Sequence, residues 1–188
     1  MLNQIRPAIV LTILLSAVTG LAYPLAITGA AQAAFPAQAN GSRITQDGVL
    51  IGSDLIGQNF SAPQYFWPRP SATGPEPYNA AASTGSNIGP TGKALVERVA
   101  AAVTATGQSA VPADAVTTSG SGLDPHISPQ YAAMQVARVA TARGVEIAAV
   151  QTILADVTET PILGIFGEPR VNVLRLNLAL DKAAPLRN

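Results

Sequence analysis

An uninterrupted apolar stretch lies near the start of the chain. Ala8 to Thr28 (AIVLTILLSAVTGLAYPLAIT) contains ten Leu, Ile and Val residues and no charged residue. A helix of about 21 residues is long enough to cross a hydrocarbon core of about 30 Å. We therefore expect a single transmembrane helix over residues 7–30. Arg6 precedes this span, so the positive-inside rule predicts that residues 1–6 are cytoplasmic and that the rest of the chain is extracytoplasmic.

The same stretch is also compatible with a cleaved signal peptide, because Ala31-Gln32-Ala33 is a site of the A-x-A type. The apolar run is longer than the usual 7–15 residues, and Tyr23 stands where an interfacial aromatic anchor is expected, which favours a retained helix. Pro24 should kink this helix near its far end. Residues 31–42 are small and polar, with Pro36 as a breaker, and are expected to form a juxtamembrane linker.

Residues 43–188 have the pattern of one folded domain. The turn dipeptide Asp47-Gly48 lies between apolar residues and predicts a short hairpin within Arg43–Phe60. Residues 61–91 have no periodicity and contain six prolines, together with Tyr65, Phe66, Trp67 and Tyr78. Such a segment is either an ordered binding loop or a loop packed over the domain by its own aromatic side chains.

Helical periodicity dominates the C-terminal half. One helix is expected over residues 91–106, with Thr91 as its N-cap and Gly107 as its stop. A helical hairpin should follow, with one helix from Ser128-Pro129 to about residue 143 and a second over residues 145–158.

Two short strands complete the prediction. Residues 116–119 are expected to form one strand, and the imperfect alternation over residues 171–180 predicts a terminal strand that turns helical near Leu178. Strands and helices mixed in this way predict an α+β fold class.

Composition excludes several functions. Lys plus Arg and Asp plus Glu are 11 each, so the net charge is zero; charged residues make up 12% of the chain and hydrophobic residues 48%. Without a basic excess, binding to nucleic acid through phosphate neutralisation is not expected. The chain contains no cysteine and one histidine, which excludes disulfides, thiolate zinc sites and multi-histidine metal sites.

Few motifs carry chemistry. The Gly92-Lys93 pair fails as a phosphate-binding loop, because Asn87 stands where glycine is required and Ala94 where a hydroxyl residue is required. Asp124 and His126 are close in sequence but lack a convincing nucleophile, and an aspartate before proline is typical of turn initiation. The run Ser119, Gly120, Ser121, Gly122 forms either an anion-binding nest or a purely structural turn.

Several motifs together resemble the KdpC family, the small C subunit of the bacterial Kdp potassium-transporting ATPase. In chain order they are SDLIGQ (53–58), YFWPRPSA (65–72), GSN (85–87), SGSGLDPHISP (119–129) and EPRVNVL (168–174) with NLALD (177–181). The resemblance spans essentially the whole chain and favours an uncleaved membrane anchor over a signal peptide.

This resemblance implies a non-catalytic accessory subunit. Its partners would be a channel-like potassium-binding subunit and a P-type ATPase subunit, and it would raise the ATP affinity of the ATPase subunit as a chaperone. It would have no cofactor or metal of its own, since ATP and potassium would be handled by the complex, and no D-K-T-G phosphorylation motif is present. An extracytoplasmic domain cannot touch cytoplasmic ATP, so the effect should be indirect.

Candidate binding residues follow from these inferences. Small residues that permit close helix approach are expected to meet the partners in the membrane, and the loop Tyr65–Ala72 is expected to meet them outside it. The partner-binding candidates are Ser16, Ala17, Gly20, Tyr65, Phe66, Trp67 and Arg69, and the candidate nucleotide or anion contact is Ser119–Gly122. Without the resemblance, a membrane-anchored extracytoplasmic binding or hydrolytic domain centred on Asp124 and His126 is the alternative.

Overall fold

A computed structural model describes residues 2–108 and 110–186. The chain divides into two compact units at Ile51–Gly52, and each unit is described by itself. The division falls within a strand, β2, so the short hairpin that contains β2 lies mostly in the first unit.

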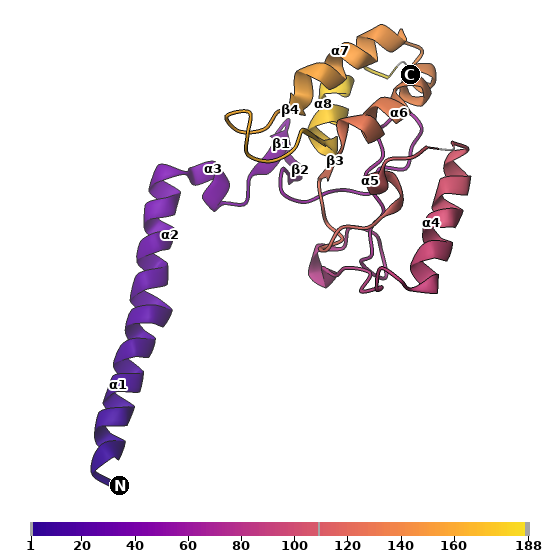
Figure 1. The fold of residues 1–188 in the computed structure, drawn as a ribbon. Coiled ribbons are helices and arrows are strands. Elements are labelled where there is room, and N and C mark those ends of the chain that lie inside the picture. Colours follow the sequence, from indigo (N-terminus) through magenta and orange to yellow (C-terminus); the bar gives the residue numbers. More distant parts are fainter. Residues whose placement is uncertain (1, 109, 187–188) are drawn as a thin grey trace. The chain divides into compact units, whose positions relative to one another are not determined.

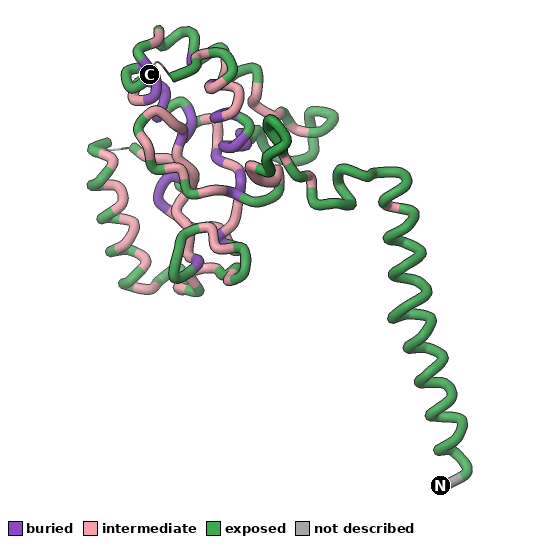
Figure 2. Tube along the Cα trace, turned by 180° about the vertical axis from the view of Figure 1, so that it is seen from behind, coloured by how far each residue is buried: buried purple, intermediate pink, exposed green. Residues whose placement is uncertain are grey.

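One continuous helix forms most of the first unit (Figure 1). After the short turn η1 (Leu2–Gln4), it comprises α1 (Ile5–Ala17), a π-helical turn η2 (Val18–Ala22) and α2 (Tyr23–Ala34). None of its described side chains is buried (Figure 2), and its mean hydropathy reaches 2.0 over 18 residues. The described helix, 30 residues long, is long and apolar enough to span a membrane, and it extends beyond the predicted span at both ends.

A proline explains the wider turn in the middle of this helix. Pro24 lacks the N–H that an α-helix would donate to the carbonyl of Gly20, and its ring crowds that carbonyl. The π-helical turn over Val18–Ala22 comes directly before Tyr23-Pro24 and leaves room for the ring.

The first unit ends in the predicted hairpin. A short helix, α3 (Pro36–Ala39), interrupts the expected linker, and β1 (Arg43–Gln46) then pairs with β2 (Val49–Ser53). Asp47 and Gly48 have φ angles of 52° and 80°, and positive φ at both central residues is what a two-residue hairpin turn of type I′ requires. The turn dipeptide in the sequence was therefore a correct signal.

The second unit is built from helices and one small sheet, which confirms the α+β prediction. Its elements are η3 (Ala80–Ala82), α4 (Lys93–Thr106), α5 (Ala113–Val116), β3 (His126–Ile127), α6 (Pro129–Arg143), α7 (Ile147–Val157), β4 (Thr158–Glu159), β5 (Arg170–Asn172) and α8 (Val173–Ala183). The antiparallel sheet has the order β3-β5-β4, with Ile127 and Thr158 both opposite Val171. Helix α7 packs against both α6 and α8, and all three helices pack against β5 (Figure 1).

Local capping explains the α6–α7 hairpin, which was predicted correctly. The Ser128 side chain accepts a hydrogen bond from the N–H of Tyr131, and Pro129 occupies the first turn of α6. Gly144 ends the helix with a φ of 65°, a conformation that costs glycine little. The buried faces of both helices, through residues such as Val139 and Val150, form the centre of the core.

Three sequence predictions were wrong in detail. The N-cap of α4 is Gly92 rather than Thr91, because Gly92 first closes a turn by donating its N–H to the carbonyl of Gly89. Residues 113–116 form the short helix α5, so the expected strand over 116–119 is absent from this described segment.

The terminal strand is also much shorter than predicted. It ends at Asn172, whose side chain accepts a hydrogen bond from the N–H of Arg175 and so begins α8 five residues before Leu178. The buried residues Val173, Leu176 and Leu180 follow helical spacing rather than alternation.

Candidate functional site

Two amide side chains hold the aromatic loop, defined here as residues 61–72, against the helices. The Asn177 side chain, from α8, accepts from the N–H of Phe66 at 2.8 Å and donates to the Phe66 carbonyl at 3.0 Å. The Gln135 side chain, from α6, makes the same pair of bonds with Trp67, at 2.8 and 3.1 Å. Each amide thus satisfies both backbone groups of one residue, as a neighbouring β-strand would.

The aromatic side chains of this loop are used within the domain. Phe66 is completely buried in the core. The Arg138 guanidinium lies 3.7 Å from the centre of the Trp67 ring, and the Tyr65 hydroxyl donates to Asp181 at 3.2 Å. Of the two interpretations of the loop, packing by its own aromatic residues therefore describes Tyr65–Trp67, while contact between the loop and a partner stays a prediction.

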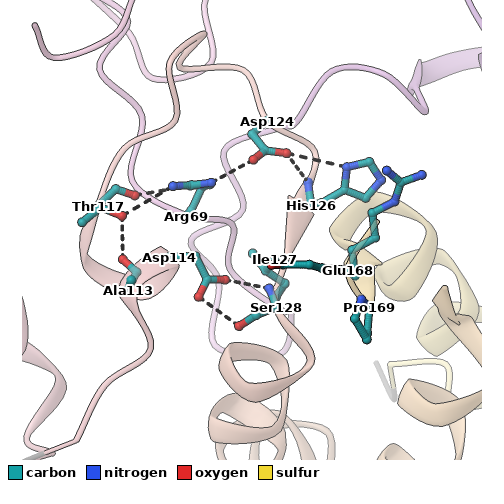
Figure 3. A pocket seen from close by; sticks show the side chains of 11 residues that line it. Arg69, Ala113, Asp114, Thr117, Asp124, His126, Ile127, Ser128, Glu168 and Pro169 are labelled. Carbon is teal, nitrogen blue, oxygen red and sulfur yellow. Dashed lines mark hydrogen bonds and ion pairs between the residues drawn. The ribbon is translucent and has the colours of Figure 1, made fainter. Parts of the chain in front are cut away.

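Arg69 of this loop also lines a polar cleft of about 620 Å³, shown in Figure 3. Its lining residues are Arg69, Ala113, Asp114, Thr117, Asp124, His126, Ile127, Ser128, Glu168, Pro169 and Arg170. Arg69 forms an ion pair with Asp124 at 2.9 Å and also donates to the carbonyls of Thr117 and Thr118. The structure thus brings together Arg69 and Asp124, which are 55 positions apart in the sequence.

The Asp124 carboxylate also interacts with His126, the only histidine of the chain. One of its oxygens accepts from the His126 N–H at 3.0 Å and lies 3.6 Å from His126 Nδ1. Burial would raise the pKa of Asp124, but the hydrogen bonds from His126 and Arg69 outweigh burial and hold this pKa below its ordinary value. Asp124 is therefore an ionised turn residue with both oxygens engaged, as expected for an aspartate that initiates a turn.

The serine in the cleft is engaged as a helix cap. Ser128 donates its hydroxyl proton to Asp114 at 2.9 Å while its oxygen accepts from Tyr131. A serine nucleophile needs a base that takes this proton. Because the Ser128 hydroxyl donates its proton to Asp114 and not to His126, the geometry does not favour a hydrolytic site centred on Asp124 and His126.

The Ser119–Gly122 turn is stabilised by its own side chains. The Ser119 hydroxyl accepts from the N–H of Gly122 at 2.9 Å, and the Ser121 hydroxyl accepts from the N–H of Leu123 at 3.1 Å. The carbonyls of Ser121 and Gly122 accept from Thr84 and from Ser71, respectively. These bonds describe a structural turn, and binding of an anion or nucleotide there stays a prediction.

The other predicted binding residues lie in the first unit. Ser16 and Ala17 are in α1 and Gly20 is in the π-helical turn, all of them exposed. Apart from the adjacent residues and the backbone of the same helix, no described atom lies within 4 Å of the position that a Gly20 Cβ would occupy. Partner contact through these small residues therefore stays a prediction. Across residues 2–108 and 110–186, no group of three potential metal ligands is present.

Sequence reasoning missed the residues that organise this region. Gln135 and Asn177 are buried polar side chains, and the Arg143 side chain is wholly buried, where it pairs with Asp181 at 2.8 Å. A signal existed: each of these residues lies on an apolar helix face, where a polar residue has to find a partner.

Comparisons with known proteins agree with one another. The family described as "K+-transporting ATPase, c chain" (KdpC) matches residues 5–182. The potassium-transporting ATPase KdpC subunits of Polaromonas naphthalenivorans and Variovorax paradoxus are each 56% identical to the chain. These matches cover 99% and 98% of this chain and 98% and 99% of the relatives. The corresponding protein of Sorangium cellulosum is 57% identical, over 97% of this chain and all of the relative.

Proposed function

The chain belongs to the KdpC family of potassium-transporting ATPase subunits, and we propose that it is a non-catalytic accessory subunit of such a complex. It assembles or stabilises the channel-like potassium-binding subunit and the P-type ATPase subunit. The observation that carries this proposal is the chemistry of the polar cleft. Its Asp124–His126 pair is fixed by Arg69, and its serine caps α6, which is an arrangement for structure rather than for turnover.

The subunit raises the ATP affinity of the ATPase subunit indirectly. In the turn Ser119–Gly122, the N–H groups of Gly122 and Leu123 already bond to Ser119 and Ser121, which reduces the capacity of this turn to bind a phosphate. The subunit would instead stabilise a conformation of the complex in which the nucleotide site binds better. ATP and potassium are then handled by the complex, and this chain needs no cofactor of its own.

A reconstitution experiment tests this role. Potassium-stimulated ATPase activity of the complex is measured with and without the chain over a range of ATP concentrations. We expect loss of the chain to raise the KM for ATP, and we expect the chain alone to hydrolyse no ATP. An unchanged KM and unchanged assembly without the chain would contradict the proposal.

A double variant separates direct from indirect action. If Ser119→Ala/Ser121→Ala assembles normally, it should leave the KM for ATP unchanged. A raised KM at equal subunit occupancy would indicate that the turn contacts ATP directly. Thr104→Ala/Thr141→Ala, at exposed threonines of α4 and α6, is the matched control, because it also removes two hydroxyl groups.

For the membrane arrangement, we propose a single pass through the bacterial inner membrane with the N-terminus in the cytoplasm. The chain contains no natural cysteine, so single cysteines report their own side of the membrane. A cysteine at Ala105 on α4 should react with a membrane-impermeant thiol reagent in intact cells, whereas one at Asn3 should react only after lysis. The opposite pattern would place the domain in the cytoplasm.

A further inference from the structure

The loop between β4 and β5 carries the densest cluster of exposed apolar side chains on the second unit. We call residues 161–167 (PILGIFG) the apolar loop. Ile162, Leu163, Ile165 and Phe166 are 71%, 84%, 79% and 64% exposed. It projects from the body of the domain in both views (Figures 1 and 2). Other strongly exposed large apolar residues in the described part of this unit are spread along the chain, such as Leu55 and Val96. An exposed apolar cluster of this kind marks an interaction site.

The apolar loop is a preformed structure. Ile162 and Phe166 exchange two backbone hydrogen bonds, at 2.9 and 3.0 Å, and the Gly164 N–H donates to the Pro161 carbonyl at 3.0 Å. At the tip, Leu163 and Gly164 have φ angles of 55° and 72°. A bulky residue such as leucine rarely adopts this conformation, and such local strain is concentrated at functional positions. A loop that is already ordered loses little conformational entropy on binding.

The charges at the base of the loop indicate what binds it. The loop itself carries no charge, and its base carries Glu159, Glu168 and Arg170, with Arg170 bonded to Glu159 at 2.8 Å. Interfacial membrane segments use Lys and Arg on the polar side and Trp or Tyr near the headgroups. The loop has apolar residues that such a segment uses on its lipid side, but it has no Lys, Arg, Trp or Tyr, and its base carries one net negative charge. The charges therefore make an anionic lipid surface a poor match.

The size of the loop also argues against a second copy of this chain. A stable interface buries about 800 Å² per partner and involves 20–30 residues on each side. A loop of seven residues supplies at most about a third of the residues that one side of such an interface needs. It is sufficient, however, as the second contact of a protein that is already held elsewhere, because attachment at one point raises the effective concentration at the other. The helix Ile5–Ala34 supplies such a first attachment.

We infer that the apolar loop docks into an apolar hollow with a basic rim on another subunit of the potassium-transporting ATPase. The inference rests on the proposed function, since it requires that the chain assembles with such a complex. The tip residues Leu163 and Ile165 enter the hollow, and Glu168 faces the basic rim. The loop and the membrane helix together form a two-point attachment.

A binding measurement with the full-length chain tests the docking. The chain, labelled at a cysteine replacing Asn3, is titrated with a complex prepared without it. Leu163→Ser/Ile165→Ser should raise the dissociation constant at least about tenfold, because two large apolar side chains no longer contribute. Both residues are exposed, so the variant should unfold at the same temperature as the wild type. Val96→Ser/Ile147→Ser is the matched control, with exposed apolar residues outside the loop, and should bind as the wild type does.

A fluorescence measurement distinguishes the possible occupants. A polarity-sensitive dye on a cysteine replacing Leu163 should report water when the chain alone is in lipid nanodiscs and an apolar environment in the assembled complex. An apolar signal in nanodiscs without the other subunits would assign the loop to lipid and overturn the inference. A water-like signal in both samples would overturn it as well.

The two proposals fail in different ways. If the wild-type chain does not bind the complex, the proposed accessory function fails and the docking inference fails with it. If the wild-type chain binds and Leu163→Ser/Ile165→Ser binds equally well, only the docking inference is overturned.

Discussion

Replacing Asn177 by alanine should be among the most destabilising changes in the second unit. The Asn177 side chain is 1% exposed and satisfies both the N–H and the carbonyl of Phe66, whose side chain is completely buried. Asn177→Ala removes both hydrogen bonds and leaves two buried backbone groups without a partner.

The size of the effect follows from these two groups. A buried polar group left unsatisfied costs about 1–3 kcal/mol, so the free energy of unfolding should fall by about 2–6 kcal/mol. That is a large part of the 5–15 kcal/mol typical of a domain. Gln135→Ala should cost less, because the bonds between Gln135 and Trp67 are only partly buried.

The only tryptophan of the chain makes the assay direct. Trp67 follows Phe66, so its fluorescence reports unfolding of this region during a urea titration of the full-length chain in detergent micelles. Asn59→Ala, at an exposed asparagine, is the matched control and should stay within about 0.5 kcal/mol of the wild type. If Asn177→Ala were equally close to the wild type, the two hydrogen bonds would not stabilise the loop as argued.

Three further predictions follow from the structure. Gly122→Ala should lower the free energy of unfolding by about 2–5 kcal/mol, and the thermal midpoint with it, because φ is 68° and a Cβ would lie 2.7 Å from the Thr84 carbonyl oxygen. Gly120→Ala, where a Cβ would meet open space, should leave the midpoint nearly unchanged, and equal midpoints for the two variants would contradict this reasoning. Arg143→Ala should lower the free energy of unfolding by about 2–5 kcal/mol in a urea titration, because it removes a wholly buried guanidinium that donates to Asp181 and to the carbonyls of Gln64 and Ala184. Arg170→Ala, at the exposed pair with Glu159, should cost less than about 1 kcal/mol, and a reversed order would refute the burial argument. The hydrogen bond from Arg175 lowers the pKa of Asp54 in the folded state. The stability that ionised Asp54 contributes is therefore present above its unfolded pKa of about 3.9 and is lost as the pH falls through its folded pKa. Asp54→Asn should reduce the loss of urea resistance between pH 6 and pH 3, and an unchanged loss would exclude this contribution.

Local signals predicted those elements whose ends are fixed by adjacent residues. Asp47-Gly48, Ser128-Pro129 and Gly144 each determine a turn or a cap from the conformation of one or two residues, and each lies where the sequence placed it. Thr91 was assigned wrongly because a competing turn from Gly89 to Gly92 moves the helix start by one residue. The prediction of a strand over residues 171–180 was wrong because their apolar spacing fits both a strand and a helix, and the Asn172 cap is what begins the helix.

The candidate site was only partly predictable for a different reason. Arg69 and Asp124 were each singled out from the sequence, but their pairing depends on the fold that brings them to 2.9 Å. The bonds from Gln135 to Trp67 and from Asn177 to Phe66 join residues 68 and 111 positions apart. No local pattern encodes such a separation, although a lone amide on an apolar helix face was a signal that a buried partner exists.

The paired amides have a consequence for hydrogen exchange. The N–H groups of Phe66 and Trp67 lie in a segment without helix or strand, where exchange with solvent is ordinarily fast. Their acceptors, however, are side chains of α8 and α6, so each amide is released only when the loop separates from that helix. The two amides should therefore exchange as slowly as those of the core helices, which makes this irregular loop part of the most slowly opening unit of the domain.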